Sequence, residues 1–236
     1  MGPQPNVASA ASLIADPART AMLASLADGR AWPAGELAAA AGVTAQTASS
    51  HLGKLLAGGF VLVEIEGRRR LYRLAGAHVA LALETLAAIT PVGTPRRTAP
   101  SREAQSFQFA RCCYDHLAGR VGVAVTKALE ARGFLRLAAN RQFDVTPAGV
   151  EWFAGLGLEV AKLKHGRRGV ARQCLDWSER EPHLAGALGA EFLTLLCANH
   201  WMRRSKASRA VEITPKGWAG LKARLGIEEM SIARDA

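Results

Sequence analysis

The sequence predicts a mainly helical α+β protein in which small β-hairpins are set between helices. Alanine, leucine and arginine, which favour helices, dominate a chain of 236 residues that is 49% hydrophobic and only 6% aromatic. Long segments carry apolar residues three or four positions apart, the spacing of one helix face. Short segments, among them 60–65 and 70–74, instead alternate apolar and polar residues as paired strands do.

The chain is long enough for two small domains. We expect an N-terminal domain over residues 7–90, a linker over 91–102 and a C-terminal domain over 103–236. The linker prediction rests on Pro91, Pro95 and Pro100, which exclude a continuous helix. The formal net charge is +10, and almost all of it lies beyond residue 90. A positive balance of this size suits a partner that carries phosphates.

Residues 7–26 have a helical apolar pattern that Asp16-Pro17 interrupts, which leaves open two helices or one kinked helix. Residues 36–41 predict a short helix that ends at Gly42. The next helix begins at Thr44, a good N-cap, and buries Ala48, Leu52, Leu55 and Leu56. Its other side chains are short and polar, and such groups suit base edges and phosphate oxygens better than a core.

A basic hairpin follows this helix. Gly58-Gly59 ends the helix, and the two alternating segments then flank a tight turn, residues 66–70, that is rich in arginine. A helix–turn–helix followed by a basic hairpin is a winged helix, in which the second helix enters the major groove and the hairpin contacts phosphates or the minor groove. The residues expected at DNA are Thr44, Gln46, Thr47, Ser49, Ser50, His51, Lys54, Arg68, Arg69 and Arg70.

Over roughly residues 10–88 the sequence resembles the ArsR family of bacterial winged-helix repressors. The motifs that carry the resemblance are Asp16-Pro17-Ala18-Arg19 with Leu23, Glu36-Leu37-Ala38, Ser49-Ser50-His51-Leu52 with Leu55, and Gly67-Arg68-Arg69-Arg70-Leu71-Tyr72. The resemblance implies a sequence-specific DNA-binding transcriptional regulator, with a repressor as the expected direction. Its partners would be double-stranded DNA, a second copy of the chain, and a small-molecule or redox effector of unidentified structure.

The resemblance also bears on the helix expected over residues 77–89. In this family the first and last helices of the winged module form the dimer interface, and the wide apolar stripe here fits that role. Packing on the C-terminal domain is the alternative.

The ligands of the family's metal sites are missing from this sequence. Alanines fill residues 38–41, where one of these sites would lie, and only His78 matches the ligands of the other site. We therefore expect no metal and no cofactor.

The C-terminal half contains a diverged internal repeat. Residues 143–150 and 211–218 each combine the end of a strand with Thr-Pro, a helix N-cap followed by a first-turn proline. A candidate hairpin precedes each Thr-Pro, at residues 134–143 and 201–211, and a predicted helix precedes each hairpin, at 107–132 and 183–200. We therefore expect two helix–hairpin–helix units in a domain that does not read bases.

Cysteines and histidines recur through this half. The candidate residues for a redox or effector site are Cys112, Cys113, His116, Cys174 and His183, with Cys197 and His200 as a further pair. On a predicted helix Cys112 and His116 would share one face, and Cys112 or Cys113 is expected near Cys174. No spacing matches a zinc knuckle, and buried cysteines with hydrogen-bonded histidines are the structural alternative. A thiol- or metal-responsive sensor is the functional one.

The remaining sequence features exclude classes of function rather than assign one. Neither a hydrolase elbow, a phosphate-binding glycine loop nor a metalloprotease helix is present, so we expect no catalytic residues and no enzyme. An enzyme or ligand-binding protein that uses a winged helix as a scaffold is the remaining alternative. For the four tryptophans beyond residue 150, the alternatives are lining a pocket or filling the core. For the basic segments 162–168 and 203–206, they are binding anions or facing solvent. Without an apolar run long enough for a membrane span or a signal pattern, we expect a cytoplasmic protein.

Overall fold

The computed structural model of the chain describes residues 6–90, 102–163 and 169–234, and its chain divides into two compact units, Met1–Leu83 and Glu84–Ala236. The predicted linker thus lies almost entirely outside the described residues. In the described part, no helix combines the length and the apolar character that crossing a membrane requires.

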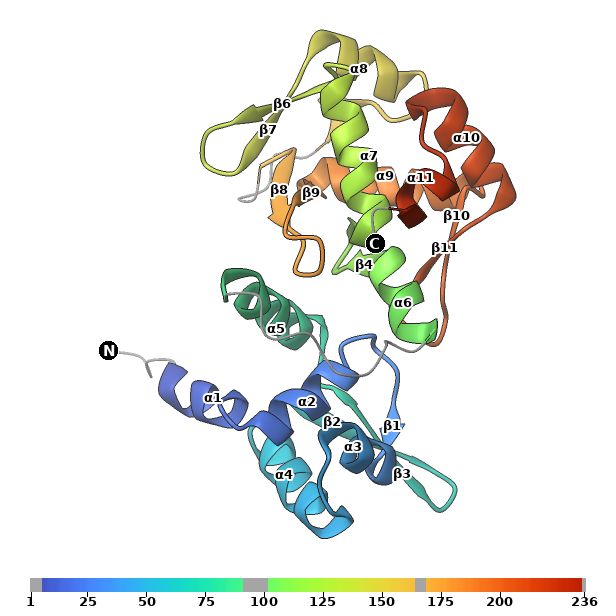
Figure 1. Cartoon of the computed structure of the whole chain (residues 1–236). Coiled ribbons are helices and arrows are strands. Elements are labelled where there is room, and N and C mark those ends of the chain that lie inside the picture. Colours follow the sequence, from blue (N-terminus) through green and yellow to red (C-terminus); the bar gives the residue numbers. More distant parts are fainter. Residues whose placement is uncertain (1–5, 91–101, 164–168, 235–236) are drawn as a thin grey trace. The chain divides into compact units, whose positions relative to one another are not determined.

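The first unit is a winged helix (Figure 1). Its elements are α1 (Val7–Ile14), α2 (Pro17–Ser25), β1 (Trp32–Pro33), α3 (Ala34–Ala41), α4 (Ala45–Ala57), β2 (Val61–Glu66), β3 (Arg69–Leu74) and α5 (Ala77–Ile89), of which residues 77–83 belong to this unit. The three strands form an antiparallel sheet in the order β1-β3-β2. Fully buried leucines from α2, α3 and α4 make its core, together with Val61 from the hairpin.

Local sequence sets the boundaries of these helices. The Asp16 side chain accepts a hydrogen bond of 2.9 Å from the Arg19 amide and caps α2, so residues 7–26 form two helices rather than one. Gly42 has a φ of +66° and ends α3 in the left-handed conformation that glycine favours. Thr44 caps α4 by accepting a hydrogen bond from the Thr47 amide. The predicted helix–turn–helix is therefore present at the predicted residues.

The second unit contains the predicted repeat and more. Its elements are α6 (Arg102–Phe109), β4 (Arg111–Cys113), β5 (His116–Ala118), α7 (Gly119–Ala131), β6 (Leu135–Ala138), β7 (Gln142–Val145), α8 (Pro147–Ala154), a short 3-10 turn (Val160–Lys162), β8 (Arg172–Leu175), β9 (Pro182–Ala185), α9 (Gly186–Ala198), β10 (Met202–Arg204), β11 (Val211–Ile213), α10 (Pro215–Leu225) and α11 (Glu229–Arg234). Helix α7 with hairpin β6–β7 and α8 corresponds to α9 with β10–β11 and α10. Thr146 and Thr214 cap the closing helices, each with proline in the first turn, as predicted.

Two further hairpins correct the predicted helices. Residues 107–132 and 183–200 were each expected to be one helix, but β4–β5 occupies 111–118, and β9 pairs with β8 before α9 begins. Both helices start at a glycine with positive φ, Gly119 at +79° and Gly186 at +80°. A Cβ at Gly119 would lie 2.5 Å from the Gln108 carbonyl oxygen, so the chain makes a close turn there that a continuous helix could not.

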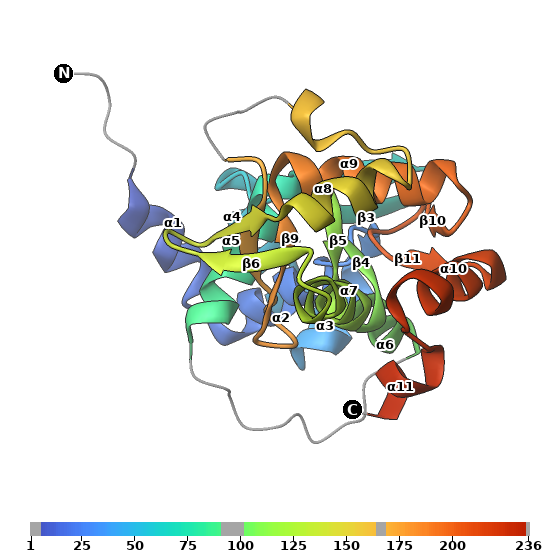
Figure 2. The same ribbon diagram turned by 90° about the horizontal axis from the view of Figure 1, so that it is seen from above.

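The helix of each repeat packs against a strand of the other repeat. Helix α7 packs on β9 of the other repeat, α9 packs on β5, and β5 contacts β9 between the two helices (Figure 2). Aromatic packing fills the core beside α8, where the Trp152 ring stacks on Phe134 with centroids 5.3 Å apart and meets Phe192 edge-on. Trp218 lies against Phe109. Trp152, Trp201 and Trp218 all pack against the hydrophobic core, which favours the core-packing alternative for these three side chains.

Candidate nucleic-acid interface and a buried cysteine–histidine cluster

Helix α4 has one apolar face and one polar face. Ala48, Leu52 and Leu55 are fully buried, which fixes how the helix is rotated on the core. The side chains on its opposite face are exposed and polar: Thr44, Gln46, Thr47, Ser49, Ser50 and Lys54. Leu56, expected in the apolar stripe, is 39% exposed. The helix thus presents hydrogen-bonding groups along one side while the other side holds it in place.

His51 differs from its neighbours on α4. Its side chain is only 15% exposed, and Nδ1 lies 3.3 Å from a guanidinium nitrogen of Arg19 and 3.8 Å from Asp16 Oδ1. Arg19 in turn donates to the carbonyl oxygens of Leu13 and Ser12, at 2.6 and 2.8 Å. His51 therefore connects α4 to the junction between α1 and α2, a position that suits holding the helix rather than reading bases.

The wing is a β-hairpin with a two-residue turn, Gly67-Arg68. Glu66 pairs with Arg69 across the turn, and Gly67 at the tip has a φ of +59°, a value that suits tight hairpin turns. Arg68, Arg69 and Arg70 are all exposed. Lower on the hairpin, Arg73 forms an ion pair with Glu64 on the neighbouring strand. Positive charge is thus concentrated at the tip of the hairpin.

A second candidate site lies inside the C-terminal unit. Cys113 is paired with His116 across hairpin β4–β5, and Cys174 is paired with His183 across β8–β9. Because β5 contacts β9, the two pairs meet, and their four potential ligand atoms all lie within 4.8 Å of one another. The sequence singled out all four residues, but it did not indicate that they form one cluster.

The cluster is compact and largely closed to solvent. Cys113, His116 and His183 are buried, with 4%, 6% and 1% of their surface exposed, and Cys174 is half-buried. The Nε2 atoms of the two histidines lie 3.2 Å apart. The Cys113 thiol donates a hydrogen bond of 3.6 Å to Glu84 Oε2, and its contact with Cys174 together with burial raises the pKa of Cys113 to about 12. The same contact lowers the pKa of Cys174.

A carboxylate faces Nδ1 of each histidine. His116 Nδ1 lies 2.8 Å from Asp115 Oδ1, and His183 Nδ1 lies 3.6 Å from Asp176 Oδ2. The distance at His183 is too long for a hydrogen bond, and its Nδ1 is a buried atom without a partner. Both rings therefore direct Nδ1 toward a carboxylate and Nε2 into the cluster.

Asp176 is itself held in a buried network. Its Oδ1 accepts a hydrogen bond of 2.6 Å from Arg111, and its Oδ2 accepts one of 2.8 Å from the Gly119 amide. Burial alone would raise the pKa of Asp176, but Arg111, His183 and these hydrogen bonds together lower it to about 2. Arg111 was not singled out from the sequence, and Asp176 was noted beside Cys174 but was not among the expected site residues. The network joins the first repeat to the second through a charged pair of which at most 1% is exposed.

Cys112 does not belong to the cluster. Neighbouring residues of a strand point to opposite faces, so Cys112 packs into the hydrophobic core while Cys113 faces the histidines. Burial raises the pKa of the Cys112 thiol, which contacts the Tyr114 carbonyl oxygen at 3.5 Å. The expectation that Cys112 and His116 share a helix face was wrong, because the segment is a hairpin. Cys113 is the cysteine that meets Cys174.

A signal for the cluster was present in the sequence. Arg111-Cys-Cys-Tyr-Asp-His-Leu-Ala-Gly119 and Arg172-Gln-Cys-Leu-Asp, followed by His183-Leu-Ala-Gly186, share the order Arg-x-Cys-x-Asp and then His-Leu-Ala-Gly. The second copy carries a longer turn between aspartate and histidine. Repeat detection based on Thr-Pro alone missed this agreement. Aligning the two halves over their full length would have matched each cysteine and each histidine with its counterpart.

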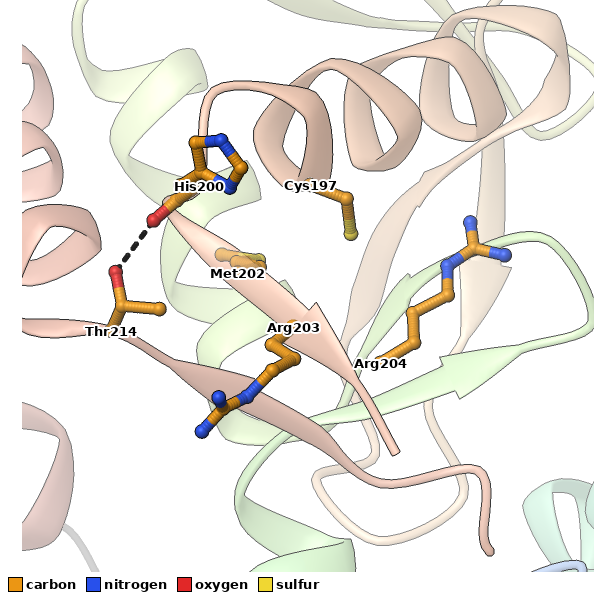
Figure 3. A pocket seen from close by; sticks show the side chains of 6 residues that line it. All are labelled: Cys197, His200, Met202, Arg203, Arg204 and Thr214. Carbon is orange, nitrogen blue, oxygen red and sulfur yellow. Dashed lines mark hydrogen bonds between the residues drawn. The ribbon is translucent and has the colours of Figure 1, made fainter. Parts of the chain in front are cut away.

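The remaining candidates do not converge on a site. Cys197, His200 and Met202 line a hollow with Arg203, Arg204 and Thr214, but Arg203 and Arg204 point to opposite sides of β10 (Figure 3). Arg203 is also paired with Glu212 at 2.7 Å. The other basic segment lies mostly outside the described residues, and Lys162, which is described, pairs with Glu159.

Sequence comparisons with known proteins agree with the winged unit. Residues 14–64 match a family model described as a helix-turn-helix domain. The HTH-type transcriptional regulator CmtR of Mycobacterium tuberculosis is 44% identical over 73 residues, 31% of this chain and 61% of CmtR. Among solved structures, the homodimeric winged helix-turn-helix DNA-binding domain of Mb0332 from Mycobacterium bovis is 31% identical, covering 38% of this chain and 89% of that one, with a TM-score of 0.34. The solution structure of CmtR, a cadmium sensor, is 35% identical over 40% of this chain and 98% of that one, with a TM-score of 0.32.

A longer match includes both units. The uncharacterised HTH-type transcriptional regulator YdfF of Bacillus subtilis is 42% identical over 224 residues, which are 95% of this chain and 99% of YdfF. The C-terminal unit is therefore shared with a regulator and is not peculiar to this chain. With a winged helix in the structure and a relative that matches over nearly its full length, this chain belongs to the helix-turn-helix transcriptional regulators.

Proposed function

We propose that this DNA-binding regulator acts as a homodimeric repressor, in which each α4 enters the major groove and each wing contacts the backbone beside it. The observation that carries the proposal is the division of α4 into a buried apolar face and an exposed polar one. Such a division positions side chains of a rigid helix for contact with base edges.

Within α4 the exposed residues fall into two roles. Gln46, Thr47, Ser49 and Ser50 are uncharged, and their donors and acceptors suit base edges. Thr44 lies at the helix N-terminus and Lys54 carries a charge, which suits phosphate contacts. His51 faces Arg19 and Asp16, so its role in this proposal is to position the helix.

The dimer proposal rests on α5. Leu86 and Ile89, near the end of this helix, are 40% and 68% exposed, although each is a large apolar side chain. A second copy of the same helix would cover this stripe, and a two-fold protein matches a pseudo-palindromic DNA site. The C-terminal unit would bind the effector that changes the spacing of the two reading heads.

Replacing Gln46 by alanine tests base reading. The variant should lose about 1–3 kcal/mol of discrimination at one base pair of each half-site, because one set of hydrogen bonds to a base edge disappears. Binding to random duplex DNA should stay unchanged. Competition binding with a set of single-base variants of the preferred site measures both quantities.

A matched control is Gln142→Ala, which removes the same group from the C-terminal unit. Equal loss of affinity for preferred and random DNA in the Gln46 variant would show that Gln46 does not read sequence.

A further inference from the structure

We infer that Cys113, His116, Cys174 and His183 form a tetrahedral Cys2His2 site for Zn²⁺ or a similarly thiophilic divalent cation, and that this ion joins the two repeats of the C-terminal unit. The inference is independent of how the winged unit binds DNA. Its ligands come from the hairpins β4–β5 and β8–β9 and not from the helices in which the resembling family carries its metal sites.

The positions of the four side chains fit one ion. Two sulfurs and two imidazole nitrogens are a usual donor set for tetrahedral zinc, with Zn–S near ~2.3 Å and Zn–N near ~2.0–2.1 Å. These bond lengths place neighbouring ligand atoms roughly 3.3–3.8 Å apart in a tetrahedron. The two Nε2 atoms lie 3.2 Å apart, and all four ligand atoms lie within 4.8 Å of one another. Small rotations of the side chains would therefore complete the geometry.

The histidines are oriented as metal ligands usually are. A ligating histidine commonly gives its other ring N–H to a carboxylate, which fixes the tautomer and the ring direction. Here Asp115 faces Nδ1 of His116, and Asp176 faces Nδ1 of His183. His183 Nδ1 is buried and unpartnered, and a slight shift of the ring on binding a cation would bring it within hydrogen-bonding reach of Asp176.

The internal repeat gives each half an equal share. Each hairpin supplies one cysteine, the histidine opposite it across the strands, and an aspartate two residues after the cysteine. Two equivalent hairpins meeting at β5 and β9 thus supply four ligands in all. Packing alone does not require two thiols and two imidazoles at this place. Apolar residues would fill the same buried space without leaving a nitrogen atom unpaired.

Charge and access favour a closed, soft site. On binding, each thiol loses its proton, so two thiolates balance the charge of a divalent cation and leave a neutral buried centre. Hard cations such as Mg²⁺ and Ca²⁺ prefer oxygen ligands and are disfavoured. With four protein ligands no position remains for water, which indicates a structural or sensing ion rather than a catalytic one.

Cobalt substitution tests the inference on the full chain. Reduced protein, freed of metal with a chelator, is titrated with Co²⁺ and then with Zn²⁺. We expect about one Co²⁺ per chain, with the intense visible bands of four-coordinate cobalt and ultraviolet thiolate-to-cobalt charge transfer, and displacement by about one equivalent of Zn²⁺. X-ray absorption of the zinc form should show two sulfur and two nitrogen neighbours.

Variants assign the ligands. Cys113→Ser and Cys174→Ser should each remove about half of the charge-transfer intensity or abolish binding, whereas Cys112→Ser and Cys197→Ser should leave the spectrum unchanged. Asp115→Asn keeps all four ligands and is nearly isosteric, and the Asp115 side chain is 46% exposed, so the fold should persist while affinity falls about 10–100-fold.

Three results would overturn the inference. They are uptake of well under one ion per chain by the reduced wild type, a six-coordinate cobalt spectrum, and full charge-transfer intensity in both Cys113→Ser and Cys174→Ser. A reduced protein that binds no metal but forms a Cys113–Cys174 disulfide on mild oxidation would replace the metal site with a redox pair. Because these measurements use no DNA, their failure is distinct from failure of the proposed DNA contacts.

Discussion

Replacing both Arg68 and Arg69 by alanine is expected to weaken binding to duplex DNA of every sequence. The same change should flatten the dependence of log affinity on log salt by about one to two units, because each arginine that neutralises a phosphate releases a counterion. Both side chains are exposed at the tip of the wing and are available for such contacts. Fluorescence anisotropy over a range of salt concentrations gives the slope directly.

The control removes the same charge elsewhere. Arg203→Ala with Arg204→Ala also lowers the net charge by two, but at exposed positions in the C-terminal unit. The two double variants separate a specific wing contact from a general charge effect. An unchanged slope in the wing variant, or an equal change in both, would contradict the assigned role of the hairpin.

Replacing Asp176 by alanine is expected to cost the C-terminal unit about 3–5 kcal/mol of unfolding free energy. The substitution leaves the Arg111 guanidinium, which is 1% exposed, buried without its carboxylate partner. It also removes the acceptor for the Gly119 amide where α7 begins. Urea unfolding followed by tryptophan fluorescence reports on this unit, since four of the five tryptophans lie in it. A chelator and a reductant keep any bound metal out of the comparison.

Glu212→Ala is the matched control for this change. It breaks the Arg203–Glu212 ion pair, in which both side chains are more than half exposed, and should cost at most about 1 kcal/mol. If the two variants lost equal stability, the buried pair would not be the link between the repeats that its geometry indicates.

Local signals predicted the winged unit well. Gly42 in the left-handed conformation and the Thr44 cap are each determined by one residue and its near neighbours, so the sequence shows them directly. The same holds for the capping threonines of the C-terminal repeat, Thr146 and Thr214.

Non-local contacts account for what the sequence did not show. Residues 111–118 have a composition that a helix tolerates, but Arg111 is held by Asp176, which follows 65 residues later in the chain. His51 was expected at DNA because the helical spacing leaves it outside the apolar stripe of α4, and only the folded structure places Arg19 beside its ring. The expectation of no metal rested on the missing ligands of the family's metal sites and on the lack of a zinc-knuckle spacing, and neither criterion considers a cluster that combines two hairpins. Its two histidines are 67 positions apart.

Selection of bound duplexes from a random DNA pool by the wild-type chain tests the central claim most directly. The account predicts enrichment of a two-fold symmetric sequence whose half-sites are centred about 10 base pairs, or a multiple of that, apart. It also predicts that the Gln46→Ala variant enriches a less restricted sequence. A wild-type pool without sequence preference, or an unchanged preference after alanine replaces Gln46, Thr47, Ser49 and Ser50 together, would contradict the claim that α4 reads DNA.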